Sequence, residues 1–341
     1  MNEKSYRNIK IESLPGSKAK ISGEITVSAF EKARKTAIEH AKVSTEVPGF
    51  RVGKAPENLV INHVGEIKIL ERAAESAIND MYADIIDDHK VRAIGMPHIS
   101  ITKIATGNPL GFILETSVMP EISLSNYKAL ASEAIKKIDD AITTVEEKEV
   151  DDVIQDLRKR LGAMEGEEKG LPEFNDEFVK KLGDFATVND FKEKARENIL
   201  EHKKLEVKDK RRAAIADALI AESKFDAPEV IIESELNTML GQFRADIERN
   251  GYTLQGYLEQ IKKKEEDIRK EWHESAVRRA KLELILKHIA RSEKIAPEEE
   301  EIKKEIDHIV SHHKTADRFR VRMYVENLAT NKKVFEFLEN Q

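Results

Sequence analysis

One loop in the N-terminal third carries residue types suited to binding a partner. Residues 47–56 contain two prolines and two glycines, which exclude a regular helix. Phe50 and Arg51 stand together between Gly49 and Gly53. A phenylalanine can fill an apolar pocket, and an arginine can donate a fork of hydrogen bonds to a carboxylate or phosphate. The segment predicts a docking loop, or else an ordinary loop whose Phe50 folds back onto its own helices.

Residue types that could support catalysis are present, but not in catalytic arrangements. The histidines at 308, 312 and 313 have a helical spacing that could bring two imidazoles to one metal, but two ligands do not make a selective site. Carboxylate runs at 298–301 and 139–140 lie among lysines, with no apolar pocket to shift a pKa. No phosphate-binding glycine loop or nucleophile motif occurs. We therefore predict no catalytic residue, no metal and no cofactor.

The sequence on both sides of the loop indicates the strands and helices that position it. Strand-like runs joined by turn residues occur in pairs at 6–27 and again at 99–119. The spacing of Ser28 and Glu31 is that of a capping box and predicts a helix start at Ser28, with the helix running to about Thr45. We expect hairpins plus long helices, hence an α+β domain at residues 1–120 with the loop between two helices.

Two more helices should complete this domain. Pro56 suits the first position of one, because its missing N–H would have no partner there. The other should follow Gly65, where an apolar stripe runs from Ile67 to Ile85.

The remainder of the chain reads as helical. A connecting segment at 121–172 should contain one helix through Val150 and Leu161, followed by a glycine-marked connection at 162–170. Thr187, with Asp190 three residues on, predicts the start of a long helix. Further starts are expected at Pro228, Thr253 and Pro297, with the helix from Thr253 reaching Glu293 and two shorter helices ending near Leu338. The region 173–341 is thus predicted to be an extended, mostly α-helical domain with protruding arms.

Composition narrows the function classes. Charged residues make up 35% of the 341-residue chain and aromatic residues 6%, which favours long, solvated helices over a sheet buried on both faces. The chain has no cysteine, signal-peptide pattern or membrane-length apolar run, so a cytoplasmic location and no membrane association are expected. Residues 1–125 are electrically balanced, and the net charge of −7 falls in the rest, which argues against general nucleic-acid binding.

Apolar side chains on the C-terminal helices have two possible roles. Most should form seams between helices, but a minority could line an open cradle for unfolded chains. The residues considered for such a surface are Phe225, Met239, Phe243, Leu254, Tyr257 and Leu258.

The loop Gly49-Phe50-Arg51-Val52-Gly53-Lys54-Ala55-Pro56 closely resembles the Gly-Phe-Arg-x-Gly-Lys-x-Pro signature of the bacterial trigger factor family. The similarity extends to Met96-Pro97 and to the segments at 118–122 and 171–178. It then covers the helical region to about residue 310, including 228–230 and 284–290.

This resemblance implies a function. In that family the loop docks beside the nascent-chain exit of the large ribosomal subunit, and helical arms shelter emerging polypeptide without ATP. Carried over, the ribosome-binding residues are Gly49, Phe50, Arg51, Val52, Gly53 and Lys54. Val52 stands where many members have lysine, so one positive contact is missing here. The family's usual prolyl-isomerase domain, of the FK506-binding type, has no counterpart, because residues 128–170 contain no aromatic residue and no strand pattern.

The prediction is an ATP-independent holdase chaperone, not an enzyme, whose partners are the ribosome and nascent or unfolded polypeptides. Formation of a homodimer off the ribosome is left open. A ribosome-associated adaptor that binds one folded partner is the alternative, and a metal enzyme using the histidine pair is a remote third.

Overall fold

A computed structural model describes residues 4–124, 126–138, 144–165, 171–312 and 316–341. Its contacts divide the chain into two compact units. Unit 1 comprises Met1–Ile122 and Lys224–Leu284, and unit 2 comprises Ser123–Ser223 and Ile285–Gln341. Each unit thus combines segments that are distant in sequence, and the contiguous boundaries at 120 and 172 remain a prediction.

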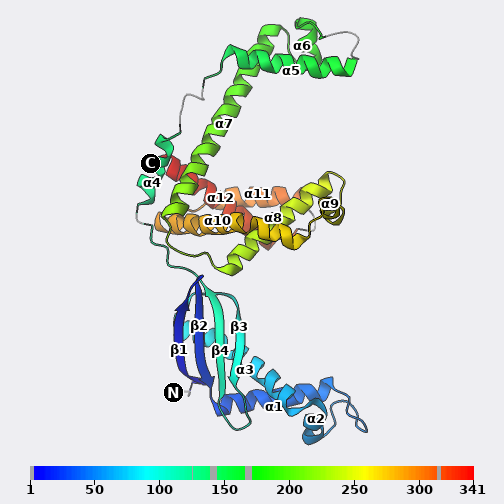
Figure 1. The fold of residues 1–341 in the computed structure, drawn as a ribbon, viewed down its shortest axis with the longest axis vertical. Helices are drawn as coiled ribbons and strands as arrows, with labels where there is room; N and C mark the ends of the chain where they lie inside the picture. The colour runs from blue at the N-terminus through cyan, green and yellow to red at the C-terminus, as the bar shows by residue number, and fades with distance from the viewer. Residues whose placement is uncertain (1–3, 125, 139–143, 166–170, 313–315) are drawn as a thin grey trace. The chain divides into compact units, whose positions relative to one another are not determined.

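The N-terminal part of unit 1 is built on a four-stranded antiparallel sheet (Figure 1). Its strands are β1 (Tyr6–Leu14), β2 (Lys18–Ile25), β3 (Ala93–Lys103) and β4 (Leu110–Val118), in the order β1-β2-β4-β3. On the central strands Ile21 pairs with Leu114, and Ile25 with Leu110. All four side chains are fully buried, because alternate residues of a strand share one face. The two predicted hairpins are confirmed.

Three helices accompany this sheet: α1 (Val27–Ser44), α2 (Glu57–Val64) and α3 (Glu66–Asp88). Phe30 of α1 and Ile69, Ile78 and Ile85 of α3 join the buried strand residues in one core. The side chain of Ile67, which we expected in the apolar stripe, is 71% exposed. The stripe instead includes Ile69, because α3 begins at Glu66 and turns Ile67 toward solvent.

The predicted starts of α1 and α2, the helices on either side of the loop, differ from the observed starts by one or two residues. The N-cap of α1 is Thr26, whose hydroxyl accepts a hydrogen bond from the Ala29 N–H at 3.5 Å, and not Ser28. Strand β2 ends at Ile25, so the chain turns into the helix at once and Thr26 is the first polar side chain available. Pro56 is the N-cap of α2 and not its first helical residue.

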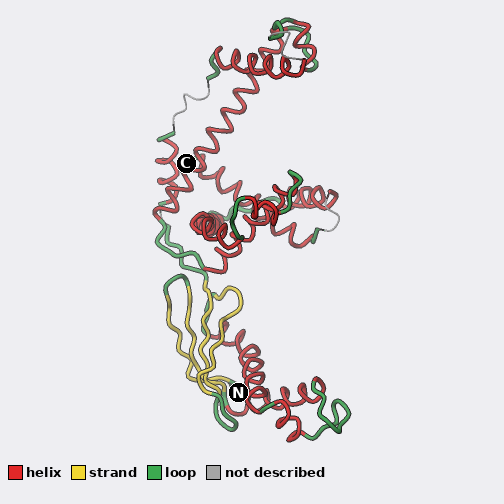
Figure 2. The backbone as a smooth tube through the Cα atoms, turned by 45° about the vertical axis from the view of Figure 1, so that its right-hand side comes forward, coloured by secondary structure: helices red, strands yellow, loops and turns green. Residues whose placement is uncertain are grey.

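The second segment of unit 1 contains α8 (Glu229–Arg249), α9 (Leu254–Gln260) and most of α10 (Glu265–Ser292) (Figure 2). The predicted single helix from Thr253 to Glu293 is wrong. It breaks at Lys262, which has a φ of 53°. The Asp267 carboxylate then accepts the Lys264 N–H at 2.9 Å and caps the new helix, α10.

The described residues of unit 2 form helices joined by turns and loops, with no strand among them. Its helices are the end of α10 with α4 (Tyr127–Lys136), α5 (Glu147–Glu165), α6 (Asp176–Leu182), α7 (Val188–Glu222), α11 (Glu299–His312) and α12 (Arg318–Glu339). The capping box of Thr187 and Asp190 is confirmed. The connecting segment holds α4 as well as the expected α5, and one helix, α12, replaces the two short ones expected near the C-terminus. The histidine at 313, the carboxylates at 139–140 and the glycines at 166 and 170 lie outside the described residues.

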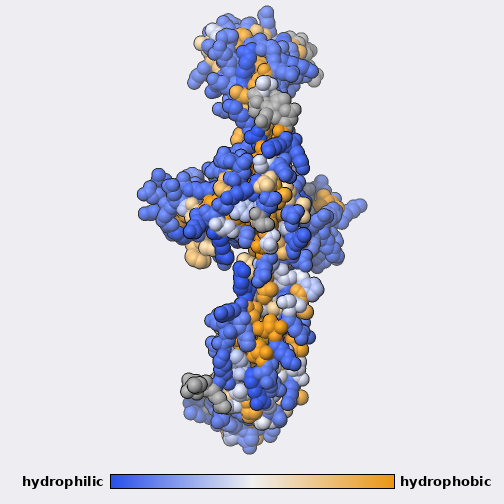
Figure 3. Space-filling model, turned by 90° about the vertical axis from the view of Figure 1, so that its left-hand side faces the viewer, coloured by the Kyte–Doolittle hydropathy of each residue, from blue (hydrophilic) through white to orange (hydrophobic). Residues whose placement is uncertain are grey.

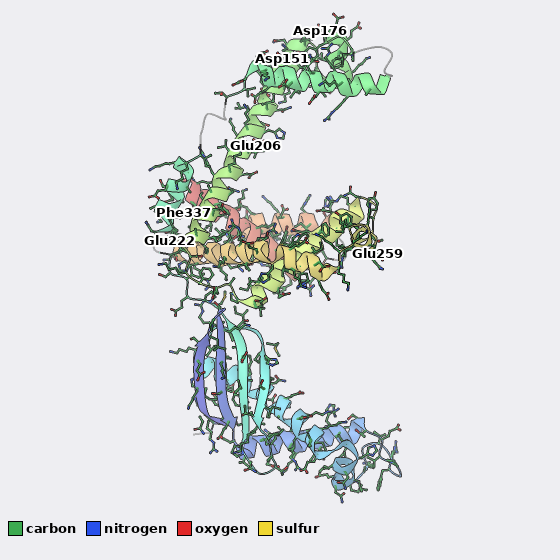
Figure 4. All side chains as sticks on the ribbon, in the orientation of Figure 1. Asp151, Asp176, Glu206, Glu222, Glu259 and Phe337 are labelled. Carbon is green, nitrogen blue, oxygen red and sulfur yellow. The ribbon has the colours of Figure 1, made fainter. Side chains whose placement is uncertain are left out.

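Aromatic packing closes the end of unit 2 formed by α5, α6 and the start of α7. Phe191 contacts Phe185 and Phe174 edge-on, with ring centroids 5.1 and 5.8 Å apart. Asp176, labelled in Figure 4, accepts the Val188 N–H at 2.8 Å and ties α6 to α7. Elsewhere polar residues dominate the surface, and on the visible face apolar residues gather in narrow seams (Figure 3).

Candidate docking loop and apolar surfaces

The candidate docking loop connects α1 to α2 and is anchored at both ends. Val47 and Ala55 are buried with Ala41 of α1 and Val60 of α2 in a small apolar cluster. Between these buried ends, Phe50, Arg51 and Val52 are exposed. The arrangement fixes where the loop leaves and rejoins the helices.

Backbone hydrogen bonds define the path of the loop between these anchors. The Gly53 N–H donates to the Lys42 carbonyl of α1 at 2.9 Å, and the Lys54 N–H donates to the Arg51 carbonyl at 2.9 Å. Gly49 and Gly53 have φ angles of 85° and 82°, in the region that side chains disfavour. The two glycines therefore permit two reversals of the chain on either side of Phe50 and Arg51.

The tip of the loop presents apolar and cationic side chains to solvent. Phe50 is 42% exposed and Val52 is 46% exposed. Arg51 and Lys54 are also exposed, and neither makes an ion pair with the described residues. Phe50 is thus not folded back onto its helices. The tip offers two apolar contacts and two cations that are free to meet a partner.

A neighbouring lysine braces the base of the loop. The Lys42 ammonium contacts the Glu39 carboxylate of its own helix at 2.6 Å and that of Glu57, at the start of α2, at 3.3 Å. The hydrogen bond to Glu39 is the main cause of the raised pKa of Lys42, with that to Glu57 adding to it. Lys42 thus links the two helices with its side chain and the loop with its carbonyl.

The six apolar residues considered for a client surface are all half-buried. Phe243 of α8 lies against Tyr257 of α9 and Trp272 of α10, with ring centroids 5.6 and 5.2 Å apart. Phe225 and Met239 pack on the buried α8–α10 core, while Leu254 and Leu258 lie on α9. Five of the six residues therefore lie on the neighbouring helices α8 and α9. The sixth, Phe225, precedes α8 and lies under Lys281. Whether clients contact them stays a prediction.

Sequence reasoning missed two features of these surfaces. Trp272 completes the aromatic cluster. It lies almost thirty residues after Phe243 in the sequence, so no local pattern indicated that the two rings are in contact. On α12, the side chains of Phe319, Met323, Tyr324 and Leu328 are all more than half exposed. The spacing of four residues within each pair was a usable signal. Val321 and Val325 have the same spacing, however, so the sequence did not show which of these apolar stripes is buried.

Metal chemistry receives no support from the described residues. His308 and His312 have ring centroids 4.6 Å apart, but no group of three or more His, Cys, Asp or Glu in this part of the chain could hold a metal ion. Within the same residues, no helix is both long and apolar enough to cross a membrane.

Two family models match most of the chain. The model of the bacterial trigger factor protein matches residues 7–157, and that of its C-terminus matches residues 187–340. No match to a prolyl-isomerase domain lies between them. These matches place the chain in a class of ribosome-associated chaperones. More narrowly, it belongs to the trigger factor family.

Individual relatives agree with this assignment. The chain is 25% identical to the trigger factor of Clostridium tetani, over 82% of this chain and 84% of that protein. It is 24% identical to that of Caldicellulosiruptor bescii, over 97% and 96%. The second alignment has 427 positions, more than the 341 residues of this chain, so the relative contains residues without a counterpart here.

One solved structure has the same fold. It comes from work on promiscuous substrate recognition in the folding and assembly activities of the trigger factor chaperone. Its TM-score is 0.58 at 16% identity, covering 98% of this chain and all of that chain. This likeness confirms the predicted fold class, an α+β N-terminal part followed by a long, mostly helical region.

Proposed function

We propose that this chain docks on the large ribosomal subunit, near the exit tunnel, through the loop at 47–56. Its helical region would bind nascent or unfolded polypeptides in the cytoplasm without ATP. The observation that carries this proposal is the loop itself: a family signature whose ends are buried and whose Phe50, Arg51 and Val52 are exposed.

The chemistry of the tip suits a surface made of protein and RNA. Phe50 and Val52 can insert into an apolar recess, while Arg51 and Lys54 can pair with carboxylates or phosphates. Because Val52 replaces a lysine common in the family, docking should depend less on salt than it would with lysine there.

Client binding needs adaptable apolar surface together with charge that keeps the complex in solution. The half-buried aromatic cluster of Phe243, Tyr257 and Trp272 supplies the first, and the charged helical surface supplies the second. We also propose that the chain has no prolyl-isomerase activity. The described residues between 126 and 165 form two helices and contain no strand on which an aromatic pocket could be built.

Co-sedimentation with ribosomes tests the docking proposal. The parent chain should pellet with ribosomes, and a variant with Phe50→Ala, Arg51→Ala and Val52→Ala should remain in the supernatant. Ile11→Ala is the control, because Ile11 is a 39% exposed apolar residue on β1 of the same sheet domain. If the triple variant pellets like the parent, the loop is not the docking site.

Aggregation assays test the client proposal. The parent should delay the aggregation of several unrelated denatured proteins. Selective binding of one folded partner, with no effect on aggregation, would instead establish an adaptor.

A further inference from the structure

Helix α12 presents an unusual amount of exposed apolar surface. Phe319 is 71% exposed, Met323 54%, Tyr324 56% and Leu328 52%. Residues four apart stack on one side of a helix, so these side chains form two pairs, Phe319 with Met323 and Tyr324 with Leu328. Arg320 projects between the pairs. We call these five residues the α12 face.

A hollow between α11 and α12 adjoins this face at Phe319. It is lined by Glu299, Lys303, Ile306, Arg318, Phe319 and Arg322. The two arginines are already paired: Arg318 contacts Asp307 at 2.6 Å, and Arg322 contacts Glu299 at 2.6 Å. With the charged ends held in these pairs, the arginine stems, Ile306 and Phe319 give the hollow a mostly apolar lining. It suits an apolar side chain of a partner.

The remaining charge on the α12 face is positive. Asp317 accepts the backbone N–H groups of Phe319 and Arg320, and Glu326 pairs with Arg322 at 2.8 Å. Arg320 is exposed and makes no ion pair with the described residues. The acidic groups near the face are thus engaged, which leaves one guanidinium between two apolar pairs. A carboxylate is its natural partner.

We propose that the α12 face binds short client segments that combine large apolar side chains with an Asp or Glu. The apolar residues would contact the two pairs and the hollow, and the carboxylate would pair with Arg320. This inference rests on the proposed chaperone function and specifies the class of segment bound.

The size of the face favours a short segment over a second copy of the chain. Four side chains exposed to this extent offer about 450 Å², whereas a stable protein interface buries roughly 800 Å² on each partner. A peptide of about ten residues could cover the face.

Fluorescence anisotropy with labelled 12-residue peptides tests the proposal. The peptides share three leucines and one phenylalanine and differ at one central position, which is Glu, Gln or Lys. The parent should bind the Glu peptide about fivefold more tightly than the Lys peptide, the expectation for one solvent-exposed ion pair. That preference should shrink at high salt, because exposed charges are screened.

Three variants assign the effect to residues. Arg320→Gln should bind all three peptides equally, and Arg320→Glu should prefer the Lys peptide. Phe319→Ala combined with Leu328→Ala should weaken binding of every peptide by tenfold or more. Ile67→Ala is the matched control, because Ile67 is as exposed as Phe319 but lies in unit 1. Equal melting temperatures would show that the variants are folded.

Two outcomes would overturn the inference: equal affinity of the parent for the Glu and Lys peptides, or a preference that persists in Arg320→Gln. If the parent still suppressed aggregation in either case, the chaperone function would stand and the α12 face would not be its acidic-segment site. If the parent bound no peptide and suppressed no aggregation, both proposals would fail.

Discussion

Replacement of Gly53 by alanine should weaken ribosome docking without unfolding the protein. Gly53 has a φ of 82°, and its N–H donates to the Lys42 carbonyl, so it holds the end of the loop against α1. A Cβ added there would lie 3.6 Å from Val43 Cγ1, an ordinary contact, so the cost is backbone strain and not a clash. A left-handed alanine costs about 1–2 kcal/mol.

Most of this strain should appear in the affinity for the ribosome. The loop is exposed and can relax to another path in the free protein, but docking requires the path that presents Phe50 and Arg51 together. A cost of 1–2 kcal/mol then corresponds to an affinity about 5- to 30-fold lower. Titration of labelled protein with ribosomes would measure this change, and thermal unfolding would show a nearly unchanged melting temperature.

Gly107 provides the matched control. It has a φ of 70° with no atom near an added Cβ, and it lies in the β3–β4 turn, where its N–H donates to Glu31 near the start of α1. Gly107→Ala should carry the same strain but leave ribosome affinity unchanged. Equal binding by Gly53→Ala and the parent, or an equal loss in both variants, would refute the idea that loop conformation governs docking.

Three other predictions concern packing, ionisation and catalysis. Phe191→Ala removes a 7% exposed side chain from the aromatic cluster of unit 2 and should cost about 3–5 kcal/mol. Hydrogen exchange should accelerate in α5 and α6 while the β-sheet keeps its protection. The Tyr127 hydroxyl donates to Glu293 at 2.6 Å, and this bond, with burial, raises the pKa of Tyr127 to about 12 from 10.0. That contribution to stability is complete below pH 10 and is lost as pH rises to about 12, so Tyr127→Phe should melt with a shallower pH dependence over this interval. The pure protein should not accelerate prolyl isomerisation in a short peptide, and rapid catalysis would contradict our interpretation of residues 128–170.

The loop was predictable because its signals are local. Prolines and glycines exclude helix whatever lies around them. The capping-box spacing of Ser28 and Glu31 and the proline at 56 predicted the two helices that frame the loop. Exposure of Phe50 was not predictable, since the same residues allow an inward orientation. It follows from the burial of Val47 and Ala55, whose partners Ala41 and Val60 lie on two different helices.

The errors in the helical region arise where tertiary contacts or caps outweigh propensity. Nothing near Lys262 resembles a helix breaker, yet the chain adopts a positive φ there and Asp267 caps a new helix. Near the C-terminus two helices were predicted but one continuous helix, α12, is found over 22 residues. Val325 packs on α11 and the later Val334 is also buried, and this burial along its length keeps α12 continuous. A sequence pattern cannot weigh such contacts before the partner helices are placed.

The part of the chain where the two family-model matches adjoin forms an apolar core of its own. Val150 and Ile154 of α5 are buried with Phe178 of α6 and Phe191 of α7 in one core. The Arg158 guanidinium donates to the Pro172 carbonyl at 2.7 Å, joining α5 to the segment before α6. If these helices depended on a further domain to cover them, its absence would expose these apolar side chains to water. Exposure would cost roughly 1.5–3 kcal/mol of stability for each large side chain. Because they bury one another, α5, α6 and the start of α7 need no additional domain to cover them.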